Sequence, residues 1–290
     1  MTAAAAGTLR LAGREVPRLG YGTMRLTGPH IFGPPADRDE AVRVLRRAAE
    51  LGVRVIDTAW YYGPHVADEI LAEALYPYPD DLVIVTKLGG ARRDDGSWYS
   101  ALSEQELRDG CEQDLRLLRR ESLPVAHLRW MPDTDVPFLD ALATMTALRN
   151  EGKVEHIGLS NVTEEQVDAA LVQTPIVTVS NAYSVLNRSD DSLVDRCARE
   201  GIAYLPFFPL GASPVRSGAG VSGGEGIAGM AQRLGVAETQ VALAWLLQRS
   251  ATMLPIPGTS SVRHLEENVA AAELHLSAAD VSALDAISGG

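Results

Sequence analysis

The chain has 290 residues, of which 46% are hydrophobic and 22% charged, so it can bury a large apolar core. A formal net charge of −12 argues against a surface for nucleic acids or anionic membranes. No run reaches the roughly 18 apolar residues of a membrane span, and the alanine-rich start lacks the basic leader of a signal peptide. We therefore expect a cytoplasmic protein whose residues 1–7 are disordered. Cys111 and Cys197 have no ligand spacing, which predicts free buried thiols and no metal site.

Short apolar runs alternate with amphipathic segments along the whole chain. A hairpin is expected over residues 8–16, followed by a strand at 18–24 and a helix at 40–51. Further strands are expected at residues 53–58, 82–87, 123–129, 154–160, 176–182, 202–207 and 252–256. Further helices are expected at residues 66–75, 103–119, 135–150, 163–172, 189–200, 225–235, 238–249, 262–271 and 277–287.

Eight β/α units without a linker predict an α/β protein whose residues 1–290 form one closed (β/α)₈ barrel, with an N-terminal hairpin and extra C-terminal helices. An open doubly wound sheet is the alternative. It would need a Gly-x-Gly-x-x-Gly turn, and the run from Gly20 to Thr23 does not continue that way. Two long connections, residues 89–100 and the glycine-rich 211–224, are predicted to overhang the face where barrel enzymes keep their sites, and the second is expected to be mobile.

Two predicted neighbouring strands end in opposite charges, one at Asp57 and the next at Lys87. Parallel strands lie about 4.8 Å apart, so the carboxylate and the ammonium can meet where both strands end. In each run the valines at alternate positions share a face with the charged residue. A lysine held beside a tyrosine would lower the tyrosine pKa from about 10, which makes Tyr62 a candidate proton donor and Tyr61 its rival. Each residue alone also fits an ordinary turn or a solvated lysine.

Four motifs together resemble those of the aldo-keto reductases, in order and over nearly the whole chain. They are Asp57-Thr58-Ala59-x-x-Tyr62-Gly63, Lys87 after Val-Thr, Gly158-Leu159-Ser160-Asn161, and Ile256-Pro257-Gly258-Thr259-Ser260 before Glu266-Glu267-Asn268. Members of this family are (β/α)₈ barrels that reduce aldehydes and ketones with NADPH and without a metal. The resemblance implies that Tyr62 protonates the carbonyl oxygen while hydride reaches the carbonyl carbon, with Lys87 and Asp57 adjusting the tyrosine.

The fourth catalytic position of this family is a histidine near the end of the fourth strand, and here it has several candidates. Anchoring on Pro132 puts Trp130 in that place, whereas a subgroup with Val-Asn-Leu-Arg in this strand puts His127 where its asparagine stands. His127 and Arg129 share a strand face. The predicted catalytic set is Asp57, Tyr62, Lys87 and His127, with Arg129 as a lesser candidate. The alternative for His127 is a packed histidine bonded to backbone.

The resemblance also implies a cofactor site. Ser160 and Asn161 match the pair that binds the carboxamide, Phe207 takes the place of the aromatic that stacks on the nicotinamide, and Leu210 and Gly211 would lie along the pyrophosphate. The predicted cofactor residues are Gly22, Thr23, Met24, Asp57, Ser160, Asn161, Ser180, Phe207, Leu210, Gly211, Ile256, Gly258, Thr259, Ser260, His264, Glu267 and Asn268.

Three of these positions depart from the family pattern. Ser180 stands where a glutamine is usual, and Gly258 and His264 stand where many members carry a lysine and an arginine. Hydroxyls after Gly258, the neighbouring Arg263 and the free amides of the following helix start can still bind an anion. NADPH is therefore expected, with NADH as the alternative.

Aromatic residues in the overhanging loops predict a pocket for a flat or apolar small-molecule carbonyl compound. They are Phe32, Trp60, Trp98, Trp130 and Phe208, and their alternative is packing against the barrel rim. The run from Tyr62 to Val66 resembles a bacterial subgroup, which suggests a pyridoxal reductase or a secondary-metabolite ketoreductase. Two other hypotheses are a cofactor-binding regulatory subunit and a non-redox lyase or isomerase that uses the tyrosine and lysine as acid and base. We expect a monomer or small homo-oligomer with no nucleic-acid or membrane partner.

Overall fold

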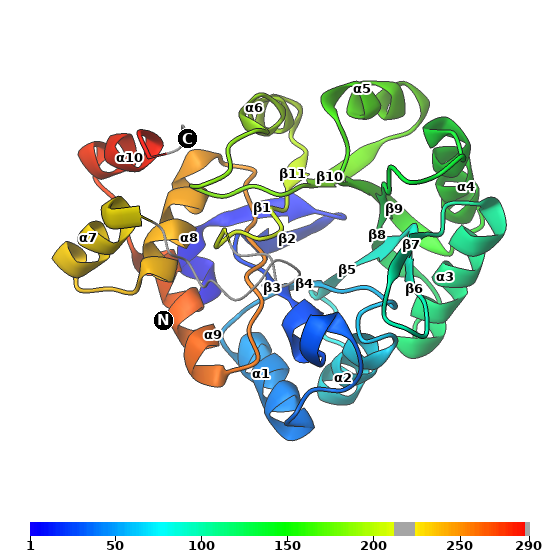
Figure 1. Ribbon diagram of the computed structural model, residues 1–290, viewed down its shortest axis with the longest axis horizontal. Helices are drawn as coiled ribbons and strands as arrows, with labels where there is room; N and C mark the ends of the chain where they lie inside the picture. The colour runs from blue at the N-terminus through cyan, green and yellow to red at the C-terminus, as the bar shows by residue number, and fades with distance from the viewer. Residues whose placement is uncertain (212–223, 288–290) are drawn as a thin grey trace.

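The computed structural model describes residues 1–211 and 224–287, which form a (β/α)₈ barrel with the helices outside the strands (Figure 1). Seven parallel strands are hydrogen-bonded in the order β11-β10-β9-β8-β5-β4-β3. They are β3 (Tyr21–Gly22), β4 (Val55–Asp57), β5 (Val83–Leu88), β8 (Leu123–Arg129), β9 (Val154–Ser160), β10 (Ile176–Ser180) and β11 (Ala203–Tyr204). The predicted fold class is confirmed.

The eighth side of the barrel is the segment at residues 252–256, which was expected to be a regular strand. It lies between β11 and β3: the Leu254 N–H donates to the Tyr204 carbonyl at 2.9 Å, and the Gly20 N–H donates to the Pro255 carbonyl at 2.9 Å. Pro255 has no N–H to donate, so a continuous ladder cannot form there. The segment therefore closes the barrel through isolated hydrogen bonds. Its position was predicted correctly, but the prediction of a regular strand was wrong.

The helices follow the strands as expected, and their predicted ends agree within one turn. They are α1 (Arg38–Glu50), α2 (Val66–Leu75), α3 (Glu104–Leu117), α4 (Phe138–Asn150), α5 (Glu164–Gln173), α6 (Asp191–Glu200), α7 (Gly224–Leu234), α8 (Glu238–Arg249), α9 (Val262–Ala270) and α10 (Ala278–Asp285). The strands expected at 18–24 and 202–207 are much shorter, as β3 and β11. Beyond β11 the pairing continues only through isolated hydrogen bonds, as Leu205 and Phe207 donate to the carbonyls of Val179 and Asn181.

The N-terminal hairpin consists of β1 (Thr8–Leu11) and β2 (Arg14–Pro17), which pair antiparallel as predicted. Its Leu11 and Val16 are buried in one apolar cluster with interior strand residues such as Val55 and Val83, so the hairpin closes one end of the barrel. Residues 1–7 are not disordered, which corrects the expectation. Ala3–Ala6 form a 3₁₀ helix, and the Ala3 N–H donates to the Leu51 carbonyl at 2.9 Å while its methyl group is buried.

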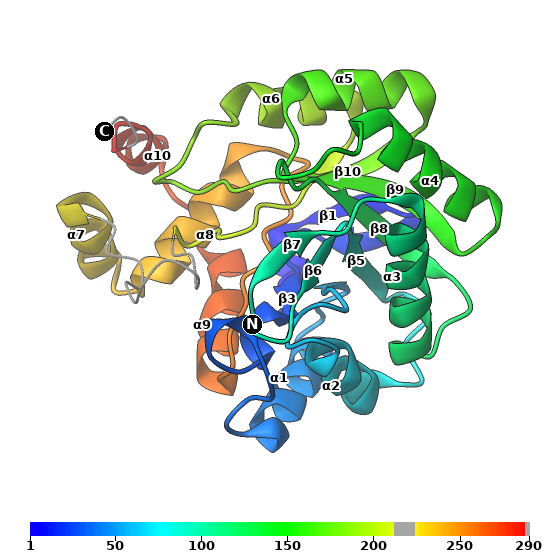
Figure 2. The same cartoon turned by 45° about the vertical axis from the view of Figure 1, so that its right-hand side comes forward.

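The connection at residues 89–100 forms a second hairpin, β6 (Gly90–Arg92) with β7 (Trp98–Ser100). Figures 1 and 2 both place this hairpin near the ends of β5 and β8, beside α3. The other predicted overhang, residues 211–224, lies outside the described residues except at its two ends.

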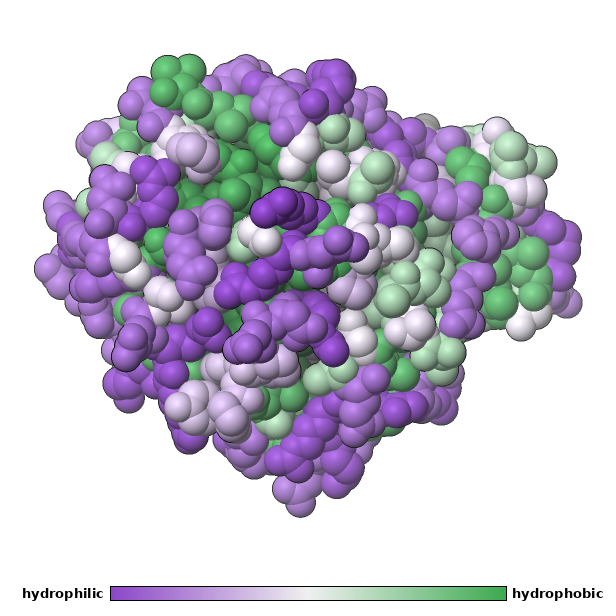
Figure 3. All heavy atoms as spheres, turned by 180° about the vertical axis from the view of Figure 1, so that it is seen from behind, coloured by the Kyte–Doolittle hydropathy of each residue, from purple (hydrophilic) through white to green (hydrophobic). Residues whose placement is uncertain are grey.

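The surface agrees with the polar composition of the chain. The face turned away in Figure 1 is covered mainly by hydrophilic residues with apolar ones between them (Figure 3). Within the described part of the chain, no helix is long and apolar enough to cross a membrane. Cys111 and Cys197 are both buried and free, as predicted.

Candidate active site

An ion pair lies at the carboxyl ends of β4 and β5, where the sequence predicts it. Lys87 Nζ donates to Asp57 Oδ1 at 2.6 Å and to the Thr58 carbonyl at 3.1 Å. The two side chains are only 4% and 6% exposed, for Lys87 and Asp57. Burial raises the pKa of Asp57, and the charges of Lys87 and Arg129 oppose that rise. The pair is therefore buried, and removal of either residue would leave the charge of the other without a partner.

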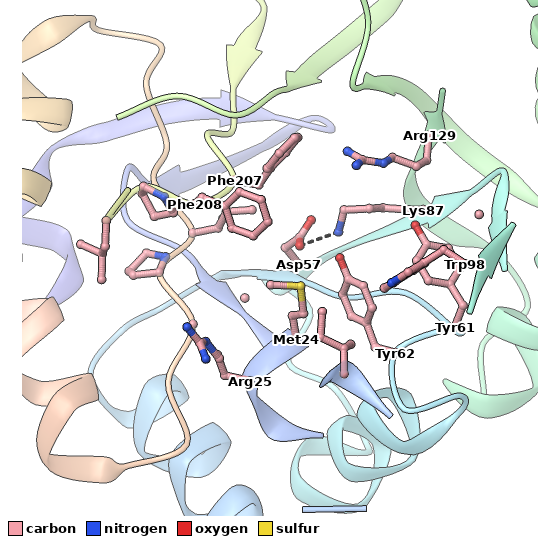
Figure 4. Close-up of a pocket in the computed structure, with 18 of the residues that line it drawn as sticks. Met24, Arg25, Asp57, Tyr61, Tyr62, Lys87, Trp98, Arg129, Phe207 and Phe208 are labelled. Carbon is pink, nitrogen blue, oxygen red and sulfur yellow. Dashed lines mark hydrogen bonds and ion pairs between the residues drawn. The ribbon is translucent and has the colours of Figure 1, made fainter. Parts of the chain in front are cut away.

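Tyr62 stands over this pair at the start of the β4–α2 turn. Figure 4 shows its hydroxyl end directed toward Lys87 and Asp57, and Lys87 Nζ lies 5.1 Å from the ring centroid. The turn requires Gly63, because its φ is +95° and an added Cβ would lie 2.5 Å from the Cβ of Val66. The local sequence thus brings the phenol to the charged pair.

The expected lowering of the Tyr62 pKa is wrong for this structure. Burial raises the pKa of Tyr62 above its usual value, the Asp57 carboxylate raises it further, and Arg129 is the charge that lowers it. Desolvation of the phenolate outweighs the cations because the ring is almost fully enclosed. Tyr62 is therefore a neutral phenol near neutral pH, which is the form that can give a proton.

Tyr61, the rival donor, also lines the cavity. Its ring meets Trp98 edge-on with centroids 5.7 Å apart. A Cβ on Gly90 would lie 3.6 Å from the Tyr61 hydroxyl, so that hydroxyl lies against β6. Burial raises the pKa of Tyr61 as well. Tyr62 and Asp57 raise it further, and the charges of Lys87 and Arg129 oppose the rise.

A cavity of about 470 Å³ opens beside these groups, a volume typical of a small-molecule site. Predicted residues on its wall are Gly22, Met24, Asp57, Tyr62, Lys87, Trp98, Phe207, Phe208, Leu210, Ile256 and Gly258. Residues that were not predicted, or were only lesser or rival candidates, are Arg25, Ile31, Tyr61, Gly90, Arg129, Met131, Pro209, Thr239 and Pro257. Arg25 directly follows three predicted cofactor residues, and this position could have indicated that it lines the cavity. Thr239 has no such signal, because it reaches the cavity only through the placement of α8.

His127 does not line the cavity, which corrects its catalytic assignment. It is fully buried, and its Nε2 is 2.5 Å from Thr178 Oγ1. Gly158 makes room for it, since a Cβ there would clash with the imidazole and with Thr178. Burial lowers its pKa well below the usual value, and Lys87 and Arg129 lower it further. His127 is a neutral packed histidine, bonded to a hydroxyl rather than to backbone.

Arg129, the lesser candidate for the fourth catalytic position, lies on the cavity wall. It ends β8 and lines the cavity, and its Nη1 donates to Ser160 Oγ at 3.1 Å. Its guanidinium carbon lies 4.8 Å from the Phe207 ring centroid. Trp130, the other candidate, is not on the cavity wall and packs edge-on against Phe138, with centroids 5.4 Å apart.

Several predicted cofactor residues do not line the cavity. Thr23 donates to Thr58 Oγ1 at 2.9 Å, and Asn161 Nδ2 donates to the Trp130 carbonyl at 2.8 Å. Ser160 and Ser180 are buried, and the Ser180 hydroxyl has no hydrogen-bond partner among the described residues.

The residues predicted for the adenosine end lie on or near α9. Glu267 and Arg263 form an ion pair at 2.6 Å, and His264 Nε2 contacts Arg263 Nη2 at 2.7 Å. The backbone carbonyl of Thr259 accepts a hydrogen bond from the Tyr21 hydroxyl at 2.5 Å. The remaining members differ in exposure: Ser260 and Gly211 are exposed and Asn268 is buried.

Two of the five predicted substrate residues, Trp98 and Phe208, line the cavity. Phe32, Trp60 and Trp130 do not. Trp60 is partly buried in the main core, with its indole nitrogen close to the backbone of α3, and Phe32 packs against Arg92 instead. For these three the rim-packing alternative is correct.

Two buried carboxyl groups lie directly behind the ion pair. The Thr58 hydroxyl donates to Asp68 Oδ1 at 2.6 Å, and Thr86 donates to Asp114 Oδ2 at 2.8 Å. Burial raises the pKa of Asp68 to about 6 and that of Asp114 well above its usual value. Both acids therefore hold a proton to higher pH than a free aspartate does, and Asp68 accepts from the residue whose carbonyl binds Lys87.

Residues 18–288 match the family model described as the aldo/keto reductase family. The chain belongs to this family. It is therefore an oxidoreductase that acts on carbonyl compounds. Within the family it is 50% identical over 287 residues to the pyridoxine 4-dehydrogenase of Escherichia coli, covering 97% of this chain and 98% of that protein.

Two further comparisons agree. An uncharacterized oxidoreductase of Schizosaccharomyces pombe is 38% identical over 283 residues, covering 98% of this chain and 90% of that protein. The crystal structure of an aldo/keto reductase from Klebsiella pneumoniae in complex with NADP and acetate is 27% identical and has a TM-score of 0.78. That likeness covers 96% of this chain and 94% of the other.

Proposed function

We propose that this protein reduces an aromatic aldehyde to the alcohol with NADPH, and that pyridoxal is such an aldehyde. The observation that carries the proposal is the neutral Tyr62 directed at the buried Asp57–Lys87 pair on the wall of an open cavity. A regulatory barrel without catalytic activity would not need a phenol beside a buried ion pair at a small-molecule cavity.

The residues of the cavity fit a nicotinamide dinucleotide. Gly22 and Gly258 bring two backbones together on the wall, because a Cβ on Gly258 would lie 2.7 Å from the Gly22 carbonyl oxygen. Phe207 offers a flat ring, and Arg25 next to this wall offers a guanidinium for a phosphate. The Ser180 hydroxyl at the end of β10 is buried without a partner in the described part of the chain, which leaves an unused donor there.

NADPH rather than NADH is supported by the NADP bound to the Klebsiella relative. For the additional phosphate this chain offers Arg263, which is exposed and paired with Glu267 at 2.6 Å. The pair must open for Arg263 to bind an anion, so the preference for NADPH is expected to be modest.

When bound, NADPH supplies the hydride. The residues of the chain supply the proton and the field around it: the Tyr62 hydroxyl gives its proton to the carbonyl oxygen as that oxygen gains charge. Lys87, held by Asp57, and Arg129 stabilise the phenolate left on Tyr62, which then takes a proton from solvent. The aldehyde gains one hydride at carbon and one proton at oxygen and becomes an alcohol.

The substrate class follows from the cavity wall and from one relative. Trp98, Phe208 and Tyr61 present aromatic surfaces that suit a flat ring. The pyridoxine 4-dehydrogenase of E. coli acts by its name on an alcohol whose aldehyde is pyridoxal. Oxidation and reduction of this pair are the two directions of one reaction.

The test is NADPH consumption with pyridoxal and with a panel of aromatic aldehydes. Tyr62→Phe should abolish turnover, while the matched variant Tyr61→Phe should retain most of it. Fluorescence titrations with NADPH and NADH give the cofactor preference separately. Unchanged turnover in Tyr62→Phe would refute the assignment of the proton donor, and no turnover of pyridoxal by the unmodified protein would exclude that substrate.

A further inference from the structure

The cavity contains a guanidinium that has no carboxylate partner within the described residues, 1–211 and 224–287. Arg129 makes a hydrogen bond to Ser160 Oγ at 3.1 Å and stacks its charge on Phe207, but it is in no ion pair there. A guanidinium has five N–H donors and keeps its charge at any physiological pH. Donors that face the cavity therefore remain for a ligand.

Arg129 is close to the reacting groups. Lys87 pairs in register with His127 on the neighbouring strand, two residues before Arg129 and on the same face. Figure 4 shows the guanidinium of Arg129 directed into the space that Lys87 and Tyr62 also face. An aldehyde oxygen beside Tyr62 is thus within reach of this cation.

The charges at this point are not balanced. Lys87 is neutralised by Asp57, and Arg129 adds a further positive charge without a carboxylate of its own in the described chain. One neutral carbonyl oxygen would leave that charge without a counter-charge in a mostly apolar cavity. A ligand with an anionic oxygen next to its carbonyl would complement it.

We propose that Arg129 makes the enzyme selective for aryl aldehydes that carry an ionised hydroxyl on the ring carbon adjacent to the aldehyde. The two oxygens of such a compound lie side by side and match the two-pronged geometry of a guanidinium, one N–H to each. The inference rests on the proposed reductase function, and pyridoxal has this arrangement of oxygens.

Pairing with Arg129 also has a chemical effect. An ionised hydroxyl next to an aldehyde donates electron density into the carbonyl and makes its carbon a poorer hydride acceptor. A guanidinium bound to that oxygen withdraws the charge and restores the electrophilic carbon. Arg129 would thus raise kcat for these compounds as well as binding them.

The test uses two pyridine aldehydes that differ at one oxygen, 3-hydroxypyridine-4-carboxaldehyde and its 3-methoxy analogue. The measured quantity is the ratio of their kcat/KM values, which cancels any general loss of activity or folding. A charge-assisted hydrogen bond contributes about 10- to 100-fold. In Arg129→Met, which keeps an unbranched apolar stem, the ratio should fall by about that factor; Arg129→Lys should retain part of it.

The control variant is Arg25→Met, which removes a different arginine of the cavity wall and should leave the ratio unchanged. A second readout is pH: in the unmodified enzyme the ratio should rise as the substrate hydroxyl ionises, and this rise should vanish in Arg129→Met. An unchanged ratio in Arg129→Met, or an equal fall in Arg25→Met, would overturn the proposal.

Calorimetric binding of the corresponding alcohols separates this inference from the reductase function. Preferential binding of the hydroxy alcohol that depends on Arg129, in a protein that reduces neither aldehyde, would overturn the proposed function and support the binding role of Arg129. Reduction of both aldehydes without preference would support the proposed function and overturn the role of Arg129.

Discussion

Replacing Lys87 by methionine tests the central electrostatic feature of the site. The substitution keeps most of the side-chain volume but leaves Asp57 buried without its partner, at a side-chain exposure of 6%. The carboxylate then has two options. It can stay ionised and unpaired, which costs about 3–5 kcal/mol, or it can take up a proton.

The cost of protonation can be calculated from the reference pKa. An unfolded aspartate has a pKa of about 3.9, so about three pKa units separate it from pH 7, and each unit corresponds to about 1.4 kcal/mol. Protonated Asp57 would therefore cost the folded variant about 4 kcal/mol at pH 7 and about 1.5 kcal/mol at pH 5. The sign follows because a carboxyl group whose folded pKa is raised destabilises the fold increasingly as pH rises.

The assay is urea-induced unfolding followed by far-UV circular dichroism at both pH values. The free energy of unfolding of Lys87→Met is subtracted from that of the unmodified protein at each pH, which removes titrations common to both. The double variant Asp57→Asn with Lys87→Met contains neither charge and should regain most of the stability while remaining inactive. A loss that is equal at pH 7 and pH 5 would refute the buried-charge argument.

Three further predictions concern the surroundings of the site. Asp68→Asn mimics the protonated acid, so it should gain stability relative to the unmodified protein as pH rises from about 4 to about 6, by about 1.4 kcal/mol per pH unit for the proton that Asp68 retains; urea unfolding across that range measures it, and parallel curves would contradict it. Gly158→Ala should lower the unfolding free energy by about 1–3 kcal/mol, because the added methyl group meets His127 and Thr178; an unchanged urea midpoint would contradict it. NADPH at about 100 times its Kd should raise the unfolding free energy by about 2.7 kcal/mol, measured as a shift in thermal unfolding, whereas no shift would mean that the cofactor does not bind.

The meeting of Asp57 and Lys87 could be predicted because it depends on rules that are local to each strand. Alternation of side chains put each charge on the same face as its valines, and parallel pairing of neighbouring strands brought the two ends together. The pKa of Tyr62 could not be predicted in this way. Its direction depends on how completely the rest of the chain excludes water from the phenol, and the enclosure outweighed the cations.

The choice between His127 and Arg129 shows the same division. Both lie on one face of β8, so the sequence pattern treats them alike. Depth in the barrel separates them: the imidazole is enclosed by Gly158 and Thr178, whereas Arg129, two residues further on, reaches the cavity. No sequence pattern within β8 indicates how far each side chain lies from the rim of the barrel.

By itself the sequence determined the order of strands and helices, the barrel and the meeting of Asp57 with Lys87, since periodicity, capping and strand-end residues are properties of short segments; its motifs indicated the family. Only the tertiary structure decided which aromatic residues line the cavity and which pack outside it, as Trp98 and Trp60 show. It also decided that Arg25 and Arg129 are the cavity cations alongside Lys87. The physical reason is that burial, and with it the free energy of a charge, depends on contacts between segments far apart in the chain.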